Sequence, residues 1–428
     1  MFGFAAQVCA AIAFVVRVFV RLSDGLDGVS LNNCGSGPLP VALKLADSAG
    51  QLCATRVRIA AAPDATRDRS LFACWEQLLH QHPGTRLYYQ SPEYFDHLDT
   101  LHRGTAFLAV LEAADGTRVG VLPLRKSPVL LKFEARSRHL FQTSFAGIEI
   151  LGGMPLAPPS REVFELLFRE IARIFQDCEA IELKGIPAQS ALWGFLQSSE
   201  PLKRQFSVYA PNGRRRYQTA LVPESFEKYL ECFPGKKQYN LKRQIRRLDK
   251  FGRGSLTLHR IDAPEGVDFF QKAWVALDGP LRPDPTRLSP AETRDLAGRG
   301  LVLSYVLTVN DRPCALAAGS RFRDTLTVHT FRHDKTLGRF SPGTVLHVLM
   351  VKDLIEHKLA HRIDYGFGEP RYRLTNEIDE RVNAIVVRKG FLNQSRIASH
   401  MSYVWLVDKA KRLMPERMAR RQRPNTEA

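Results

Sequence analysis

The sequence has few cysteines, seven in 428 residues, and no two of them form a C-x-x-C pair. The odd number and the missing pair argue against a disulfide framework and against a zinc site built on paired cysteines. His357 and His361 stand four residues apart, a spacing that can hold a metal on a helix, but no H-E-x-x-H pattern or further ligand accompanies them. We therefore expect no metal. The sequence also lacks a G-x-S-x-G elbow, which disfavours a serine hydrolase.

Long apolar runs are scarce. The stretch from Phe2 to Val16 is apolar apart from one glutamine, and arginines at 17 and 21 then interrupt it. A signal peptide needs positive charge before its apolar run, and a spanning helix needs roughly 20 apolar residues. We interpret the stretch as a weak membrane-associating helix or a poorly ordered extension. The turn formers that follow, to about Pro63, are typical of a linker, so residues 1–65 are expected to form an apolar N-terminal segment and linker.

Acidic residues are outnumbered, with 44 Asp and Glu against 61 Lys and Arg, which gives a formal net charge of +17. Such an excess suggests an anionic partner: a nucleotide-like cofactor, an anionic polymer or the inner face of a membrane. The cysteine usage fits a reducing cytoplasm.

At 428 residues the chain is too long for one ordinary core, so we expect two domains. Predicted strands and helices alternate from Leu71 onward, which indicates an α/β (α+β) fold with mixed, mostly antiparallel sheets flanked by helices. The first domain, residues 66–222, contains a hairpin turn at Asp115-Gly116. The second, residues 223–428, has a cleaner order and ends in a basic helix. Its predicted elements are a strand at 255–261, helices at 264–277 and 289–297, strands at 301–309, 314–322 and 325–332, a helix at 342–358, and strands at 362–367 and 383–388.

The turn R-F-S-P-G-T opens the helix at 342–358. Ser341 is a good N-cap, Pro342 suits the first helical position, and Gly343 lets a ligand approach the backbone closely. The N–H groups of Gly343, Thr344 and Val345 are then expected to point out of the helix start. With the helix dipole and the nearby Arg339, they predict a seat for a phosphate or pyrophosphate. The alternative is an ordinary well-capped helix.

The order of strand, two helices, three antiparallel strands, helix and strand resembles the GNAT acyltransferase fold, in which the fourth strand and the next helix grip the pyrophosphate of coenzyme A. The first domain has the same order in degraded form, which suggests tandem GNAT-like domains. The S-P-G-T turn followed by D-Y-G-F-G-E-P-R-Y-R, the basic helix K-K-Q-Y-N-L-K-R-Q-I-R-R-L-D-K-F-G and the pattern Y-Y-Q-S-P-E-Y-F resemble the cellulose-biosynthesis acetyltransferase family (CelD/BcsL type), related to FemAB-like tandem proteins. The resemblance covers roughly Leu71 to Lys411.

This resemblance implies transfer of an acyl group from acetyl-CoA or another acyl-CoA to a hydroxyl or amine of a glycan or cell-envelope component. It implies a cytoplasmic enzyme, with peripheral contact at the inner membrane left open. Nucleic acid is not the expected partner. Two alternatives stay open: a FemAB-like transferase that uses aminoacyl-tRNA, and a non-catalytic GNAT-fold subunit of an exopolysaccharide synthesis complex.

Acyl transfer needs donors for the developing oxyanion and usually a base for the incoming nucleophile. Backbone N–H groups of the strand at 325–332 are the expected donors. The candidate bases are Asp364, Glu369 and His329, each with a structural alternative: a turn cap for Asp364, an ion pair with a nearby arginine for Glu369 and a core position for His329. Tyr372 is a candidate to protonate the leaving thiolate, or else packs.

The helix at 236–253 has eight basic residues against the single Asp249, with a narrow apolar stripe of Leu241, Ile245 and Leu248. We interpret it as the solvated face of a packed helix. The sharper hypothesis is contact with an anionic glycan, with the adenosine phosphate of coenzyme A or with lipid headgroups.

Overall fold

The computed structural model describes residues 54–65, 68–82, 87–135, 138–278, 287–368 and 376–413. These residues belong to one compact unit, Leu43–Ala428. The predicted apolar segment lies outside the described residues. The predicted linker is wrong at its end, because β1 (Ala54–Ala61) pairs with β2 (Ala106–Ala113) and α2 (Ala62–Ala65) follows it. The buried side chain of Val57 explains the strand, since it packs in the core beneath the sheet.

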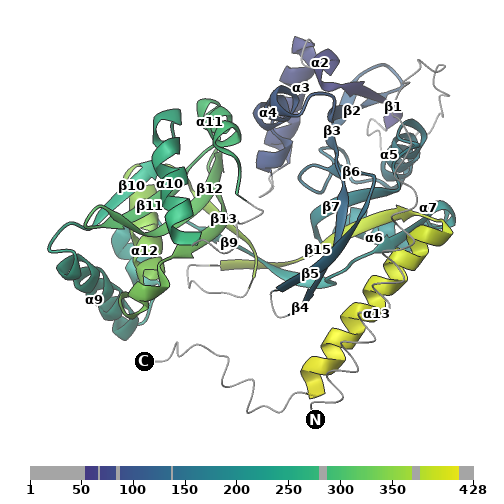
Figure 1. The fold of residues 1–428 in the computed structure, drawn as a ribbon. Helices are drawn as coiled ribbons and strands as arrows, with labels where there is room; N and C mark the ends of the chain where they lie inside the picture. Colours follow the sequence, from purple (N-terminus) through teal and green to yellow (C-terminus); the bar gives the residue numbers. More distant parts are fainter. Residues whose placement is uncertain are drawn as a thin grey trace. The chain divides into compact units, whose positions relative to one another are not determined.

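The described strands form a 13-stranded sheet and a separate two-stranded hairpin (Figure 1). The sheet order is β1-β2-β3-β6-β7-β15-β9-β14-β13-β12-β11-β10, with β8 beside β15. Two neighbouring pairs are parallel, β6 with β7 and β13 with β14, and the other described pairs are antiparallel. The predicted mixed, mostly antiparallel α/β fold is therefore confirmed. The strands not bounded above are β3 (Arg118–Lys126), β4 (Val129–Ala135), β5 (Arg138–Phe145), β6 (Gly147–Ile150), β7 (Ala180–Pro187), β8 (Phe206–Tyr209), β9 (Arg214–Leu221), β10 (Thr257–Ile261), β11 (Ser304–Val309), β12 (Arg312–Phe322), β13 (Thr325–His333), β14 (Arg362–Phe367) and β15 (Asn376–Arg388).

The helices predicted in the second domain lie close to their expected positions. They are α3 (Arg69–Gln81), α4 (Pro92–Leu101), α5 (Arg161–Ile174), α6 (Ala191–Ser198), α7 (Glu200–Gln205), α8 (Phe226–Glu231), α9 (Gly235–Phe251), α10 (Val267–Asp278), α11 (Pro290–Gly298), α12 (Pro342–Glu356) and α13 (Phe391–Leu413), with the short 3-10 turns η1 (Leu87–Gln90), η2 (Pro264–Gly266) and η3 (Lys335–Phe340). Sequence reasoning missed α4 as an element. None of the described helices is long and apolar enough to cross a membrane.

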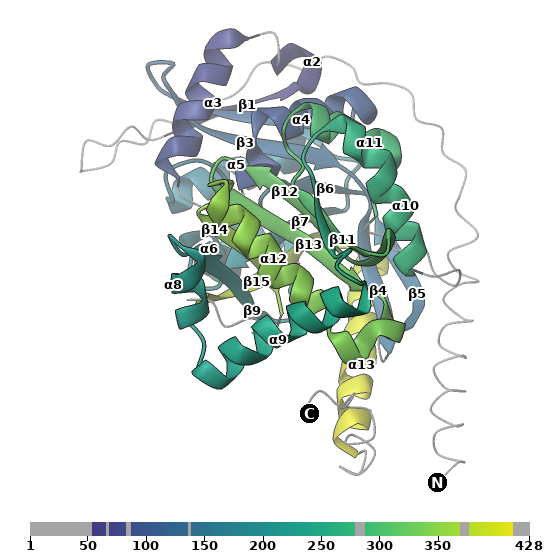
Figure 2. The same ribbon diagram turned by 90° about the vertical axis from the view of Figure 1, so that its left-hand side faces the viewer.

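The strands β11 to β13 carry apolar side chains on both faces, because helices cover both faces. Tyr305, Leu307 and Ala317 face the core that holds α12, whereas Val306 and Leu316 face Phe270 and Trp274 of α10. Successive strand residues point to opposite faces, so the two cores alternate along each strand. Figure 2 shows α12 and α10 with these strands between them.

The strand β15 lies between β7 and β9 and joins the two halves of the sheet. Residues 381–387 pair with β7, and residues 376–382 pair with β9. The sequence predicted only 383–388 as strand. β9 itself precedes the boundary predicted at residues 222 and 223 but pairs with β14, which follows it. The domain boundary stays a prediction. Strands from both sides of it in the sequence belong to the same sheet.

Candidate active site

The strands β13 and β14 pair only at their beginnings. Thr325, Leu326 and Thr327 pair with Arg362, Ile363 and Asp364, after which β13 continues to His333 without a strand partner on this side among the described residues. The edge of β13 beyond Thr327 therefore has no strand over it. This is the strand whose N–H groups were predicted to polarise a thioester carbonyl.

A bulge places His329 at the separation of the two strands. Ala318 pairs with Thr330 and Gly319 pairs with Val328, so His329 is the extra residue of β13. A Cβ atom at Gly319 would lie 2.7 Å from the carbonyl oxygen of Leu303, which explains the glycine in this crowded register. Bulges redirect side chains. His329 points to the face covered by α10, with Nε2 at 2.8 Å from the hydroxyl oxygen of Ser320.

A cavity of about 350 Å³ adjoins His329. Its aromatic lining comes from η1, α4 and α10 and consists of Tyr88, Tyr89, Tyr94, Phe270 and Trp274. The three tyrosine rings form one cluster, with centroids 4.8 to 5.5 Å apart. We predicted no site at the segment Y-Y-Q-S-P-E-Y-F, which carries part of the resemblance to the family. The helix-start signal Ser91-Pro92 could have located α4, since the Ser91 hydroxyl accepts a hydrogen bond from the N–H of Tyr94 at 3.1 Å.

A hydrogen bond and an ion pair hold α4 against α11 at this cavity. Nδ1 of His97 lies 2.7 Å from a carboxylate oxygen of Asp295, and the guanidinium of Arg299, at the end of α11, pairs with the carboxylate of Asp96 of α4. Burial lowers the pKa of His97, although Asp295 opposes the shift. Burial also raises the pKa of Tyr94, so its hydroxyl stays a neutral donor at physiological pH.

The start of α12 departs from the prediction in one respect and agrees in another. The helix does begin at Pro342, but Ser341 has φ 52°, in the left-handed region, and its side chain makes no capping bond. An N-cap side chain reaches the helix only from an extended backbone, so this conformation directs the hydroxyl away. It accepts instead from Nε2 of Gln244, at 3.3 Å.

The predicted phosphate seat is smaller than expected. The N–H groups of Thr344 and Val345 both donate to the carbonyl oxygen of Ser341, at 3.0 and 3.1 Å, so two of the three predicted donors are already used. The N–H of Gly343 has no acceptor among the described residues. A Cβ atom at Gly343 would lie 3.5 Å from the ring of His333, an ordinary contact, so the glycine is not required by packing.

Basic side chains surround this helix start. Arg339 and Arg247 both lie over the ring of Phe340, at 4.8 and 5.8 Å from its centroid. Arg247 comes from α9, which packs beside α12 in both ribbon views. Leu241 and Leu248 of α9 are buried while its basic residues are exposed, as the helical period predicts. The arrangement could neutralise a phosphate at Gly343.

Of the other predicted catalytic residues, the structure describes only Asp364. Asp364 is fully buried; one carboxylate oxygen accepts from the hydroxyl of Tyr217 at 2.6 Å and the other from the N–H of Gly366 at 2.8 Å. This is the turn cap foreseen as its structural alternative, and Asp364 does not line the His329 cavity. Glu369 and Tyr372 lie outside the described residues. Their catalytic roles, and that of Asp364, stay predictions.

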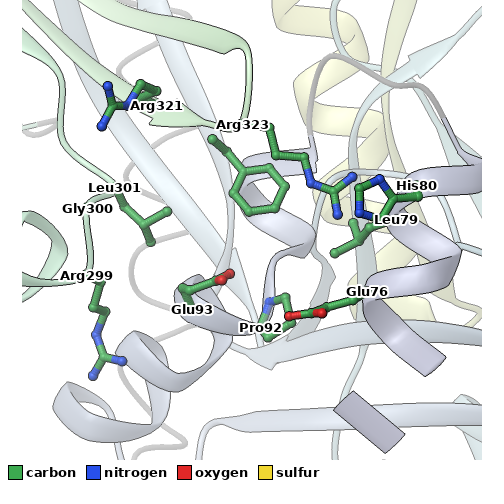
Figure 3. Close-up of a pocket in the computed structure, with 11 residues that line it drawn as sticks. Glu76, Leu79, His80, Pro92, Glu93, Arg299, Gly300, Leu301, Arg321 and Arg323 are labelled. Carbon is green, nitrogen blue, oxygen red and sulfur yellow. The ribbon is translucent and has the colours of Figure 1, made fainter. Parts of the chain in front are cut away.

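Another hollow lies beside the first residues of α4, Pro92 and Glu93 (Figure 3). It measures about 470 Å³ and brings Arg321 and Arg323, at the end of β12, towards Glu76, His80 and Glu93 of α3 and α4. It contains none of the predicted site residues, so the cavity beside His329 is the candidate active site. Within the ranges the structure describes, no group of three His, Cys, Asp or Glu side chains could hold a metal ion.

Residues 235–374 match the sequence model of the acetyltransferase (GNAT) domain family. The match contains β13 with its bulge, α12 and β14. This part of the chain is therefore similar to GNAT-type acetyltransferase domains.

Among solved structures, FemX is similar over 76% of this chain and 96% of its own, at 11% identity and a TM-score of 0.50. A tandem GNAT protein from the clavulanic acid biosynthesis pathway aligns over 78% of this chain and 99% of its own, at 13% identity and a TM-score of 0.46. The C-terminal domain of a putative lysylphosphatidylglycerol synthetase from Agrobacterium fabrum aligns over 77% and 94%, at 11% identity and 0.44. The predicted GNAT-like fold is confirmed, and the tandem arrangement stays a prediction. No curated protein matches the sequence significantly.

Proposed function

We propose that this chain transfers an acyl group, acetyl in the simplest case, from acyl-CoA to a hydroxyl or amine of a polysaccharide precursor or cell-envelope component. The observation that carries the proposal is the separation of β13 from β14 beyond Thr327, with the start of α12 and its exposed arginines nearby and the His329 cavity on the opposite face. The polysaccharide acceptor rests on the resemblance of the sequence alone.

In the proposed reaction, the pyrophosphate of the donor lies at Gly343, flanked by Arg339 and Arg247. The thioester lies along the open edge of β13, where backbone N–H groups stabilise the oxyanion. His329 takes the proton from the acceptor, whose oxygen or nitrogen then bonds to the acyl carbon. The carbon–sulfur bond breaks, and Tyr372, assigned on sequence alone, protonates the departing thiolate.

The acceptor enters through the cavity that α4, α10 and η1 line. Ser320 is buried and hydrogen-bonded to Nε2 of His329, so it fixes the ring that must accept the proton. Ser320 is a positioning residue in this mechanism.

Calorimetric titration of the whole chain with acetyl-CoA tests the donor. We expect binding that weakens when Arg339 and Arg247 are both replaced by Gln and is unchanged when the exposed Arg173 of α5 is replaced in the same way. Absence of binding by the wild-type chain would reject acyl-CoA as the donor.

A second candidate donor is aminoacyl-tRNA. The observation that favours it is the row of eight basic residues at 236–253, which are exposed and form no ion pair with described residues. Such a row suits a nucleic-acid backbone as well as the phosphates of coenzyme A. Measuring tRNA binding beside coenzyme A binding separates the two, and absence of both favours a non-catalytic subunit.

A further inference from the structure

Two side chains that are charged at neutral pH, Glu292 and Arg125, line the cavity beside His329. Only Glu292 forms hydrogen bonds or ion pairs with described residues. Glu292 accepts a hydrogen bond from the N–H of Ser289 at 2.8 Å and lies 3.4 Å from Nε2 of His102. It also lies in the first turn of α11, where the helix dipole favours an anion. Burial raises its pKa, but these hydrogen bonds outweigh burial and lower it overall. Its charge is therefore compensated.

Arg125 of β3 is not compensated in this way. Its cross-strand neighbour is Glu149, whose carboxylate is bound by Nζ of Lys184 at 2.8 Å. Arg125 forms no ion pair with any described residue, and its Nε is buried without an acceptor. A half-buried guanidinium without an anion is costly, since a charge removed from water needs a partner.

A second donor on the same cavity also lacks an acceptor. The indole of Trp274 is 3% exposed, and its Nε1 has no hydrogen-bond partner among the described residues. The great majority of buried donors in proteins are satisfied, so two side chains that line one cavity and each carry an unsatisfied donor point to a ligand that supplies acceptors.

The remaining lining indicates the shape of that ligand. Tyr89, Tyr94 and Phe270 present aromatic surface, which suits the apolar face of a pyranose ring. A ligand that combines such a sugar ring with an anionic group would lie beside His329, because His329 lines the same cavity.

We propose that the acceptor is an anionic sugar, whose carboxylate or phosphate binds Arg125 while another oxygen accepts the N–H of Trp274. The inference rests on the proposed function for its direction, because it names the substrate of the same site. A carboxylate and a phosphate share the required chemistry, and the experiment separates them.

The test compares calorimetric binding of glucose, glucuronate and glucose 6-phosphate to the whole chain, wild type and Arg125→Gln. We expect the anionic sugars to bind more tightly than glucose and to lose about 10- to 100-fold in affinity in Arg125→Gln, as for loss of a charged hydrogen bond. Glucose should be unaffected. Arg173→Gln, an exposed arginine on α5, is the matched control and should change nothing.

The tighter of the two anions identifies the charged group. Equal binding of all three sugars, or unchanged binding in Arg125→Gln, overturns the proposal. If Arg125→Gln does not fold, the wild type still decides, because only an ionic contact weakens as salt rises. Acetyl-CoA binding, measured on the same samples, distinguishes failure of the proposed function from failure of the anionic-sugar proposal. If the wild type does not bind acetyl-CoA, the proposed donor is rejected, and the sugar titrations still test the anionic-sugar proposal by themselves.

Discussion

The hydroxyl of Ser320 and Nε2 of His329 lie 2.8 Å apart across the bulge between β12 and β13. If Ser320 only positions the imidazole, Ser320→Ala should lower kcat by about three- to tenfold, the worth of one hydrogen bond. Acetyl-CoA affinity should stay unchanged. Steady-state kinetics check this, and Ser320→Thr, which keeps the hydroxyl, should restore most of the rate.

Replacing the proposed base should have a larger effect. We expect His329→Gln to lower turnover roughly 10²- to 10⁴-fold while donor binding changes little. His357→Gln, at the exposed end of α12, is the control. Near-normal turnover in His329→Gln on an established acceptor would place the base elsewhere.

Asp364→Asn separates two roles of one residue. One carboxylate oxygen accepts a hydrogen bond from the hydroxyl of Tyr217, and the other accepts one from the N–H of Gly366. In asparagine an NH₂ group replaces one of these oxygens, so one of the two hydrogen bonds loses its acceptor. We expect a loss of about 1–3 kcal/mol in the free energy of unfolding, measured with urea. If Asp364 is instead the base, turnover falls roughly 10²- to 10⁴-fold in samples that remain fully folded.

Gly343 tests the phosphate seat. Gly343→Val should reduce acetyl-CoA affinity far more than stability, because the side chain blocks approach to the free N–H group while only contacting His333. Gly343→Ala should have an intermediate effect. Unchanged affinity in the valine variant would remove the seat from the proposed mechanism.

His347 should make stability depend on pH. Burial lowers its pKa from 6.5 to about 3, and Nε2 lies 2.6 Å from the hydroxyl of Tyr365. The unfolded chain therefore binds a proton that the folded chain does not, and the free energy of unfolding should fall as pH decreases from about 6.5 towards 3. The slope is at most about 1.4 kcal/mol per pH unit for this one proton.

Urea titrations at several pH values measure that slope. His347→Gln should reduce it, whereas His80→Gln, at an exposed position of α3, should leave it unchanged. An equal slope in the wild type and His347→Gln would show that other groups control acid unfolding.

Elements with strong local signals could be predicted from the sequence. The Asp115-Gly116 turn and the start of α12 at Pro342 depend on residues that are neighbours in the sequence. The left-handed Ser341 could not be predicted, because η3 and the contact with Gln244 set its conformation. The aromatic cavity also required the fold, since η1 and α10 are distant in sequence and meet only when the sheet is complete.

The pairing of β15 with both β7 and β9 has a consequence for synthesis. Strands made early in translation keep open edges until residues 376–388 have left the ribosome and closed them. Contacts of such long sequence separation form late and slowly, and open edges invite association with other chains. The nascent protein should therefore depend on chaperones until its final strand is in place.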